Sequence, residues 1–307
     1  MSHAAAPIHD AELARLDARF AARDVAVRGG ATVSVRECGV GNSGPVFVCL
    51  HGIGSGAASW LDTALLLEEE GARVIAWDAP GYGRSTPVTA SQPSAADYAD
   101  RLQGLLDALG IERCVLVGHS LGAITAVHAA RRGSPMADRI ARLMLISPAA
   151  GYGASGKEEA SQRVRQQRLA SLAQDGIAGM AAKADQRLLS SHANERARQW
   201  VRWNMGRLND AGYTQAVALL CDADLLAELP PAMPVHVACG ALDVVTTPHA
   251  CEEVARRCGV QLALLPDAGH ASYVEQPALV AALLLHQVGL KNSANNRAIA
   301  ITGEPRQ

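Results

Sequence analysis

A serine between two glycines is the residue of this sequence best suited to covalent chemistry. The segment GHSLG (118–122) follows the apolar run CVLV and precedes the helix-compatible stretch AITAVHAA. A strand-to-helix turn this sharp strains the serine backbone, and glycines two residues to either side prevent a collision between strand and helix. We therefore predict that Ser120 is a nucleophile and that the N–H of Leu121 faces a developing oxyanion. An ordinary glycine-rich turn is the alternative, and we interpret His119 as structural.

A second oxyanion donor is expected from the segment HGIGSG (51–56), which follows the apolar run VFVCL. Acyl transfer needs two N–H groups fixed on the developing negative oxygen. The N–H of Ile53 is our candidate, because the glycines beside it allow close approach of the backbone. A phosphate-binding loop is disfavoured, since no G-x-x-x-x-G-K-[ST] or G-x-G-x-x-G follows this run.

A serine hydroxyl at its free pKa is a weak nucleophile and needs a base. His270, in the segment LLPDAGHASYVEQP, lies in a loop after the last strand-like run and is our candidate base. The chain order Ser…Asp…His places the acid before it. Asp243 follows the apolar run VHVAC, at the end of a strand where parallel sheets carry functional loops. An Asx-turn or a helix cap is the alternative interpretation of Asp243.

Apolar runs that predict β-strands position all of these segments. Helical patterns alternate with several of them, and one helix is expected from Ser94 to Gly110. Two earlier pieces, VAVRGG and ATVSVREC, predict a hairpin around Gly29-Gly30. Continuous apolar strands alternating with helices predict a largely parallel sheet covered on both faces. The six runs are VFVCL (46–50), RVIAW (73–77), CVLVG (114–118), LMLIS (143–147), VHVAC (235–239) and QLALL (261–265).

The alternation of strands and helices stops between about residues 150 and 229, where only helical patterns occur. We therefore divide the chain into a first core part (24–149), a helical insertion (150–229) and a second core part (230–290). The polar, aperiodic tail 291–307 is expected to be disordered.

The inserted helix HANERARQWVRWNMGRL offers candidates for substrate contact. Arg196, Trp200, Trp203 and Arg207 form one helical stripe. In one hypothesis an arginine holds a substrate carboxylate. In the other, which we favour, the arginines are solvated and the tryptophans pack on the core. Outside this helix, the substrate-binding candidates are Trp60 and Tyr273.

Composition excludes several classes of protein. The chain has 307 residues, of which 49% are hydrophobic and 19% charged, and its net charge is -2. These values exclude a disordered chain and an overall basic field for nucleic acid or anionic lipid. No run reaches the ~20 apolar residues that a membrane span needs, and the N-terminus shows no secretory pattern. The seven scattered cysteines, without C-x-x-C, indicate reduced and mostly buried thiols. We expect a cytoplasmic monomer or homodimer that binds no metal, nucleic acid or membrane.

Four segments in this order, HGIGSG, DAPGYGRS (78–85), GHSLG and the Asp243/His270 pair, resemble the α/β-hydrolase superfamily of the Ser-Asp-His type. The resemblance covers about residues 25–290. It implies the α/β-hydrolase fold, with a mostly parallel eight-stranded sheet, helices on both faces and the helical insertion folded over the site as a cap. It also implies that Arg84 is structural. HGIGSGAASW and GHASYVEQP are similar to 3-oxoadipate enol-lactonases and related esterases.

The resemblance implies a serine hydrolase that cleaves a carboxylic ester or enol-lactone of a small organic acid. The acyl-enzyme would form on Ser120, without metal or organic cofactor. One alternative is a carbon–carbon bond hydrolase of aromatic meta-cleavage products, although such enzymes usually carry Trp after the base histidine, where Ala271 stands here. The other is a ligand-binding, receptor-like relative with little turnover. Haloalkane dehalogenases and epoxide hydrolases use an Asp nucleophile, which Ser120 excludes.

Overall fold

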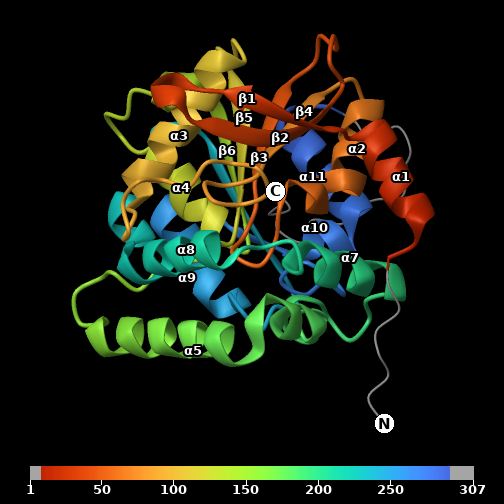
Figure 1. The fold of residues 1–307 in the computed structure, drawn as a ribbon. Helices are drawn as coiled ribbons and strands as arrows, with labels where there is room; N and C mark the ends of the chain where they lie inside the picture. The colour runs from red at the N-terminus through yellow and green to blue at the C-terminus, as the bar shows by residue number, and fades with distance from the viewer. Residues whose placement is uncertain (1–7, 291–307) are drawn as a thin grey trace.

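A mixed sheet of eight strands forms the centre of the molecule in the computed structural model, which describes residues 8–290 (Figure 1). The strands lie in the order β1-β2-β4-β3-β5-β6-β7-β8, and only the β1–β2 and β2–β4 pairs are antiparallel. The expectation of a mostly parallel eight-stranded sheet is therefore confirmed. The strands are β1 (Ala22–Ala26), β2 (Thr32–Cys38), β3 (Val46–Leu50), β4 (Arg73–Trp77), β5 (Cys114–His119), β6 (Ile140–Ile146), β7 (Val235–Gly240) and β8 (Leu262–Leu265).

Helices cover both faces of this sheet. One face packs against α3, α4 and α9, and the other packs against α1, α2 and α11. The helices of these two layers are α1 (Asp10–Arg19), α2 (Leu61–Glu69), α3 (Ala95–Ala108), α4 (Leu121–Ala130), α9 (Pro248–Cys258) and α11 (Pro277–Gln287), and the short α10 (Ser272–Glu275) precedes α11. Single 3₁₀ turns are η1 (Arg28–Gly30), η2 (Ala57–Trp60), η3 (Ala137–Arg139) and η4 (Leu225–Glu228).

The central strands are buried along almost their whole length, as their apolar sequences require. Every residue of β5 is buried, because it has β3 and β6 beside it and a helical layer on each face. The register pairs Leu50 with Gly118 and Gly118 with Leu145. Since β3, β5, β6, β7 and β8 run parallel, the loops at their carboxyl ends meet at one edge of the sheet.

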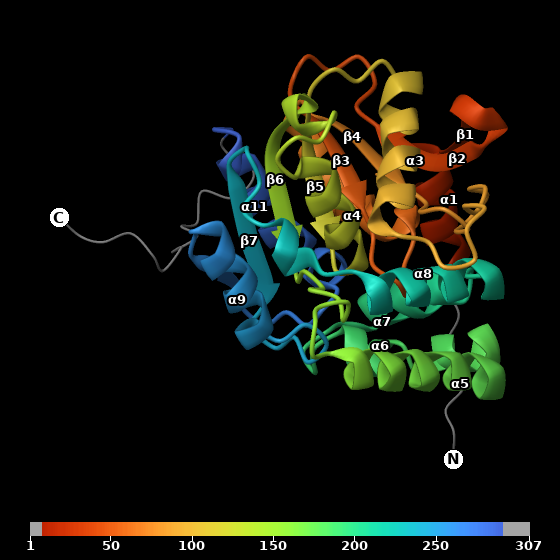
Figure 2. The same ribbon diagram turned by 90° about the vertical axis from the view of Figure 1, so that its left-hand side faces the viewer.

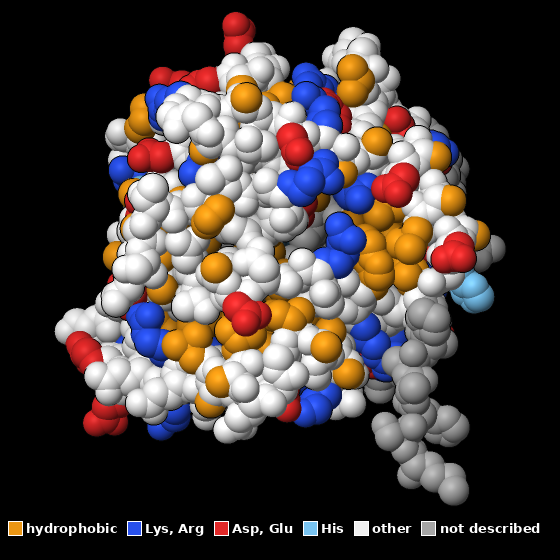
Figure 3. Space-filling view, viewed as in Figure 1, with side chains coloured by type: hydrophobic (Ala, Val, Ile, Leu, Met, Phe, Trp, Pro, Cys, Tyr) orange, Lys and Arg blue, Asp and Glu red, His pale blue; other side chains and the backbone are white. Residues whose placement is uncertain are grey.

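The chain between β6 and β7 forms helices. It contains α5 (Glu158–Ala182), α6 (Asp185–Leu188), α7 (Glu195–Met205) and α8 (Asp210–Asp222). These helices lie together across one end of the sheet in both ribbon views (Figures 1 and 2). Helix α5 is broken at Gly176, whose φ of 61° and ψ of 177° are not helical. Figure 3 shows hydrophobic side chains gathered between α8 and α5.

Two local expectations can be compared with the structure directly. Helix α3 begins after Ser94, whose side chain forms a capping box with Asp97, and Gly110 follows its end at a φ of 62°. The first strand differs from its expected position, because it spans Ala22–Ala26 and not the run VAVRGG. Its exposed edge position needs no apolar run, so Arg23 and Asp24 are accommodated facing solvent.

Two further sequence expectations concern the membrane and the cysteines. Among residues 8–290, no helix is both long and apolar enough to cross a bilayer. All seven cysteines are free thiols, and only Cys258 is not fully buried. The tail 291–307, expected to be disordered, lies outside the described residues.

Candidate active site

Ser120 sits in a strained turn between β5 and α4. Its φ of 52° and ψ of -115° lie in a region that non-glycine residues rarely adopt. A Cβ on Gly118 would lie 2.7 Å from the Cα of Ala123, and a Cβ on Gly122 would lie 2.5 Å from the oxygen of Leu50. The two glycines of the G-x-S-x-G pattern are therefore needed for close backbone contact on both sides of the serine.

Asp243 and His270 form a buried pair at the ends of β7 and β8. The Nδ1–H of His270 donates to Oδ2 of Asp243 at 2.8 Å, and both side chains are almost fully buried. Burial by itself would raise the pKa of Asp243. The hydrogen bond and the charge of His270, with the backbone N–H of Val245, instead lower that pKa to about 2. Asp243 is therefore ionised and can orient the imidazole of His270.

The second oxygen of Asp243 stabilises its own loop. Oδ1 accepts the N–H groups of Val245 at 2.7 Å and Thr246 at 3.0 Å, which is an Asx-type turn. The two interpretations of Asp243, turn former and partner of His270, thus describe different oxygens of one carboxylate. The hydroxyl of Thr246 lies 3.0 Å from Oδ2 and 3.2 Å from Nδ1 of His270. Sequence reasoning missed Thr246, although its place three residues after Asp243 suits such a turn.

The Gly52–Ile53 peptide is held in one orientation by its carbonyl. The oxygen of Gly52 accepts hydrogen bonds from Nδ1 of His51 at 2.8 Å and from the N–H of Ser55 at 3.2 Å. In a trans peptide the N–H points opposite to the C=O, so the Ile53 N–H points away from these donors. It has no acceptor among residues 8–290. A Cβ on Gly52 would lie 2.9 Å from the Cβ of Ser120, so this peptide passes directly beside the predicted nucleophile.

Hydrogen bonding fixes the tautomer of His51. Its Nε2 accepts the N–H of Ala79 at 3.0 Å, so the proton of the neutral ring is on Nδ1 and points at Gly52. Burial lowers the pKa of His51, although the charge of Asp78 opposes that shift. Tyr82 donates its hydroxyl to the oxygen of Ile53 at 2.8 Å and fixes the following peptide as well.

A cavity of about 610 Å³ joins the predicted catalytic groups. Ser120, Leu121, Ile53 and His270 all line it, together with residues of the helical insertion. Leu121 is the first residue of α4, so its N–H has no intrahelical acceptor. Within residues 8–290, no hydrogen bond joins Oγ of Ser120 to Nε2 of His270. Such contacts are often long before substrate binds.

His119 supports the base and takes no direct part in the Asp243–His270 pair. Its Nε2–H donates to the backbone oxygen of His270 at 2.9 Å, and its ring packs 4.7 Å from the rings of both His270 and Tyr273. Burial, followed by repulsion from His270, lowers the pKa of His119 well below its ordinary value. A neutral, packed histidine agrees with the structural interpretation of this residue.

A buried carboxylate that sequence reasoning missed connects the base loop to the helical insertion. Glu275 accepts the N–H of Gly269 at 2.8 Å and that of Ser190 at 3.1 Å, and it also bonds the Ser190 hydroxyl. The N–H of Ala271 donates to the oxygen of Leu188 at 2.7 Å. Movement of the insertion near residues 188–190 is therefore coupled to the loop that carries His270.

Most of the expected substrate-contact residues lie away from this cavity. Arg196 binds Asp62 and Glu12, with contacts of 2.5 and 2.7 Å, and so ties α7 to α2 and α1. Trp200 and Trp203 pack edge to face at 5.3 Å and contact the core. This arrangement corrects the hypothesis of a carboxylate-binding Arg196, because its charge is already neutralised.

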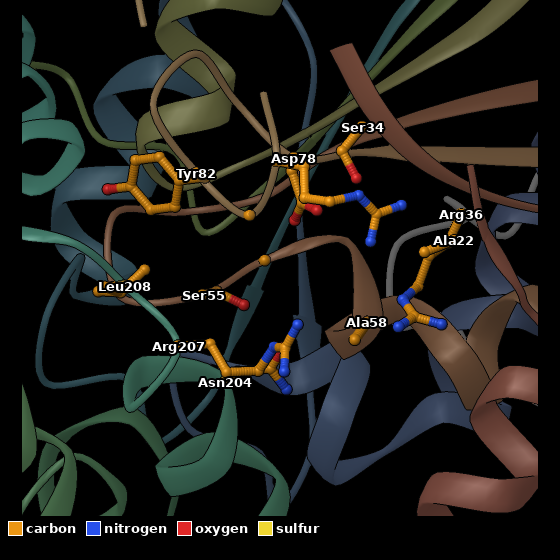
Figure 4. Close-up of a pocket in the computed structure, with 13 residues that line it drawn as sticks. Ala22, Ser34, Arg36, Ser55, Ala58, Asp78, Tyr82, Asn204, Arg207 and Leu208 are labelled. Carbon is orange, nitrogen blue, oxygen red and sulfur yellow. The ribbon is translucent and has the colours of Figure 1, made fainter. Parts of the chain in front are cut away.

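The remaining substrate-contact candidates either pack behind the cavity or line it. Arg207 stacks on Trp203 at 4.6 Å and faces a separate cavity of about 40 Å³ with Arg36, Asp78 and Asn204 (Figure 4). Trp60 is fully buried behind Tyr273, with ring centroids 4.1 Å apart. Of the six cap and aromatic candidates, only Tyr273 lines the large cavity, and its hydroxyl lies 2.9 Å from Ser55 Oγ.

Two other expectations concern Arg84 and metal binding. Arg84 binds Asp24 at the surface at 2.9 Å, which is a structural contact. In the part of the chain that the structure describes, no group of three or more His, Cys, Asp or Glu side chains is placed to hold a metal ion.

The sequence that forms this turn and sheet matches a known family. Residues 45–277 match the family profile of the alpha/beta hydrolase fold, which is more than half of the chain. The chain belongs to the alpha/beta hydrolase fold family. Membership confirms the superfamily resemblance inferred from GHSLG and HGIGSG, and it makes hydrolysis the expected reaction class.

The relatives that this chain resembles carry different enzyme names. A 2-hydroxy-6-oxononadienedioate/2-hydroxy-6-oxononatrienedioate hydrolase of Pseudomonas putida is 37% identical over 119 residues, which are 38% of this chain and 40% of the relative. A 2-hydroxy-6-oxo-6-phenylhexa-2,4-dienoate hydrolase of Comamonas testosteroni is 36% identical over 115 residues, which are 36% and 39% of the two chains. These matches therefore span about two-fifths of the curated relatives. Among solved structures, the enol-lactonase of Burkholderia xenovorans LB400 has a TM-score of 0.76 and 26% identity, covering 87% of this chain and 100% of that one.

Proposed function

We propose that this hydrolase cleaves a carboxylic ester or lactone of a small organic acid through an acyl-enzyme on Ser120. One observation supports the proposal above all others. The strained Ser120, the imidazole of His270 and two N–H groups that have no acceptor within residues 8–290 line a single cavity. A nucleophile, a base and an oxyanion site are the parts that acyl transfer requires.

The reaction has two acyl-transfer steps. Oγ of Ser120 attacks the carbonyl carbon while Nε2 of His270 takes the hydroxyl proton, and Asp243 stabilises the resulting imidazolium. The N–H groups of Ile53 and Leu121 donate to the oxyanion. The C–O bond breaks as His270 returns its proton to the leaving alcohol or enol. Water, deprotonated by the same histidine, then attacks the acyl-enzyme and releases the acid.

Carbon–carbon bond hydrolysis is the second candidate, and the names of the two curated relatives favour it. The same nucleophile and oxyanion site would serve, but the leaving group would be a carbanion equivalent that needs protonation. Ala271, after the base, counts against this candidate, because such hydrolases usually carry Trp there.

Turnover of p-nitrophenyl esters, lactones and meta-cleavage products by the purified chain tests these candidates. We expect steady ester or lactone turnover, and Ser120→Ala should reduce it below about 1% of wild type. Turnover of meta-cleavage products alone would favour the second candidate. A single burst of product with no further turnover would indicate a receptor-like relative. Residual activity of Ser120→Ala well above that level would contradict the nucleophile assignment.

A further inference from the structure

The wall that the helical insertion contributes to the catalytic cavity is positively charged. Its cations are Lys157, Arg168, Lys183 and Arg187, whereas Asp175 is its only carboxylate. Lys183 and Asp175 form an ion pair at 3.2 Å, so their charges largely cancel. A cavity with excess charge of one sign concentrates ligands of the opposite sign. The charge distribution therefore favours an anionic ligand in the same cavity as Ser120.

Arg168 is the cation of this wall that contacts a buried side chain. It is half-buried on α5, and its Nη1 donates to the hydroxyl of Tyr213 at 3.4 Å. In the described part of the chain no carboxylate lies within ion-pair distance of Arg168. Its neighbour Arg165, one turn earlier and outside the cavity, binds Asp222 at 2.6 Å. Of these two neighbours, Arg168 therefore carries the unpaired charge and faces the cavity. Lys157 and Arg187 also line the cavity without a carboxylate partner in the described part of the chain, and they add to its positive charge.

The position of Tyr213 relates this arginine to the reaction centre. Tyr213 is buried and belongs to an apolar cluster that Ile53 and Val164 also contact. Ile53 carries the proposed oxyanion N–H, so Arg168 and Tyr213 lie on the oxyanion side of the cavity. The guanidinium has five N–H donors and Tyr213 occupies one direction, which leaves donors free for a planar anion.

We propose that Arg168 binds a carboxylate group of the substrate, so that the preferred ester or lactone is that of a dicarboxylic acid with one free carboxylate. The proposal deepens the function proposed above and rests on it. Arg168 is then a specificity residue that acts on binding, because it contacts a group remote from the scissile carbonyl. A guanidinium–carboxylate pair among apolar side chains is stronger than the same pair in water.

Two esters with one leaving group separate charge recognition from catalysis. Mono-p-nitrophenyl glutarate carries a free carboxylate, and p-nitrophenyl pentanoate is a neutral ester of similar length. We expect Arg168→Gln to raise KM for the glutarate ester about tenfold or more, with kcat/KM for the pentanoate ester changed less than about twofold. Arg168→Lys keeps the positive charge but not the forked set of guanidinium donors. Its KM for the glutarate ester should therefore lie between those of wild type and Arg168→Gln.

Arg196→Gln is the matched control, because Arg196 is an arginine of the same insertion that lies outside the cavity and is already paired. It should leave the ratio of the two KM values unchanged. An equal rise in KM for both esters in Arg168→Gln, or no change in either KM, would overturn the proposal. Failure of wild type to hydrolyse either ester would count against the proposed function itself.

Binding of glutarate, measured by calorimetry, tests charge recognition without turnover. Wild type should bind glutarate, and Arg168→Gln should bind it about tenfold more weakly or worse. Absence of glutarate binding by a wild type that hydrolyses the neutral ester would overturn the carboxylate proposal and leave the hydrolase proposal intact.

Discussion

At the scale of single residues, a buried histidine next to the oxyanion loop determines how that loop presents its N–H. Ala79 donates to Nε2 of His51, so Nδ1 carries the proton and donates to Gly52. A protonated ring would lose the acceptor for Ala79, and the lowered pKa of His51 keeps the ring neutral. We therefore propose that His51 is a positioning residue, which would act on the transition state through the Gly52–Ile53 peptide.

Two amide substitutions at this position separate its two hydrogen bonds. In His51→Asn the side-chain NH₂ can replace Nδ1–H and still donate to Gly52. In His51→Gln the amide oxygen can replace Nε2 and accept from Ala79. We expect kcat to fall about tenfold to a hundredfold in His51→Gln, with KM little changed, and less than about fivefold in His51→Asn. Steady-state kinetics on one p-nitrophenyl ester measures kcat and KM of the two variants, and thermal melts confirm that they fold. Equal losses of kcat in the two variants would contradict this role.

At the scale of elements, the strand–turn–helix unit β5–Ser120–α4 depends on direct contact between backbones. Gly122 in α4 lies against the end of β3, where an added Cβ would approach the oxygens of Leu50 and His51 to 2.5 and 2.8 Å. Backbone atoms cannot rotate away as a flexible side chain can. The same contact that allows the turn therefore also links α4 to the loop that carries the proposed oxyanion N–H of Ile53.

Gly122→Ala should consequently destabilise the protein by about 1–3 kcal/mol, because the end of β3 must move. It should also lower kcat, since His51 moves with that segment. Gly104→Ala is the control: Gly104 is also helical, but its added Cβ would meet side chains at an ordinary 3.4 Å or more. Helix propensity makes that change neutral or favourable by up to about 1 kcal/mol. Urea unfolding of both variants measures the difference, and equal stabilities would refute the packing argument.

At the scale of the whole molecule, burying neutral histidines beside the site makes stability depend on pH. Burial lowers the pKa of His51 and of His119 from the ordinary value of 6.5. Below that pH the unfolded chain binds protons on these rings and the folded chain does not. Proton uptake therefore favours unfolding, and stability is lost as the pH falls below about 6.5. Asp243 contributes no loss in this window, because its pKa of about 2 keeps it ionised.

We expect the free energy of unfolding to fall between pH 6.5 and pH 5 by up to about 1.4 kcal/mol per pH unit for each of these two histidines. Urea titrations at several pH values measure this slope. His119→Gln removes one titrating ring but can still donate to the oxygen of His270, so its slope should be smaller. A stability that does not change over this range would show that the buried rings are not held neutral.

Much of the architecture could be inferred from the chain alone, because it depends on local chemistry. Apolar runs of five residues predicted the six parallel-sheet strands, and the missing strand signal between residues 150 and 229 indicated the helical insertion. The G-x-S-x-G spacing predicted a strained serine, since only glycine tolerates the contacts at Gly118 and Gly122. Each of these inferences needs only neighbouring residues.

Only the tertiary structure decided which side chains contact one another or line the same cavity. Arg196 and Arg207 have the helical spacing of a substrate-facing stripe, yet one is neutralised by Asp62 and the other faces a separate cavity. Arg168, Thr246 and Glu275 carry no motif, and each contacts a partner that is distant in sequence. These partners are Tyr213, His270 and Ser190, which lie 45, 24 and 85 residues away. Spacing along a helix determines which side chains share a face. The residues that this face contacts depend on how distant segments of the chain pack. No local sequence pattern encodes that packing.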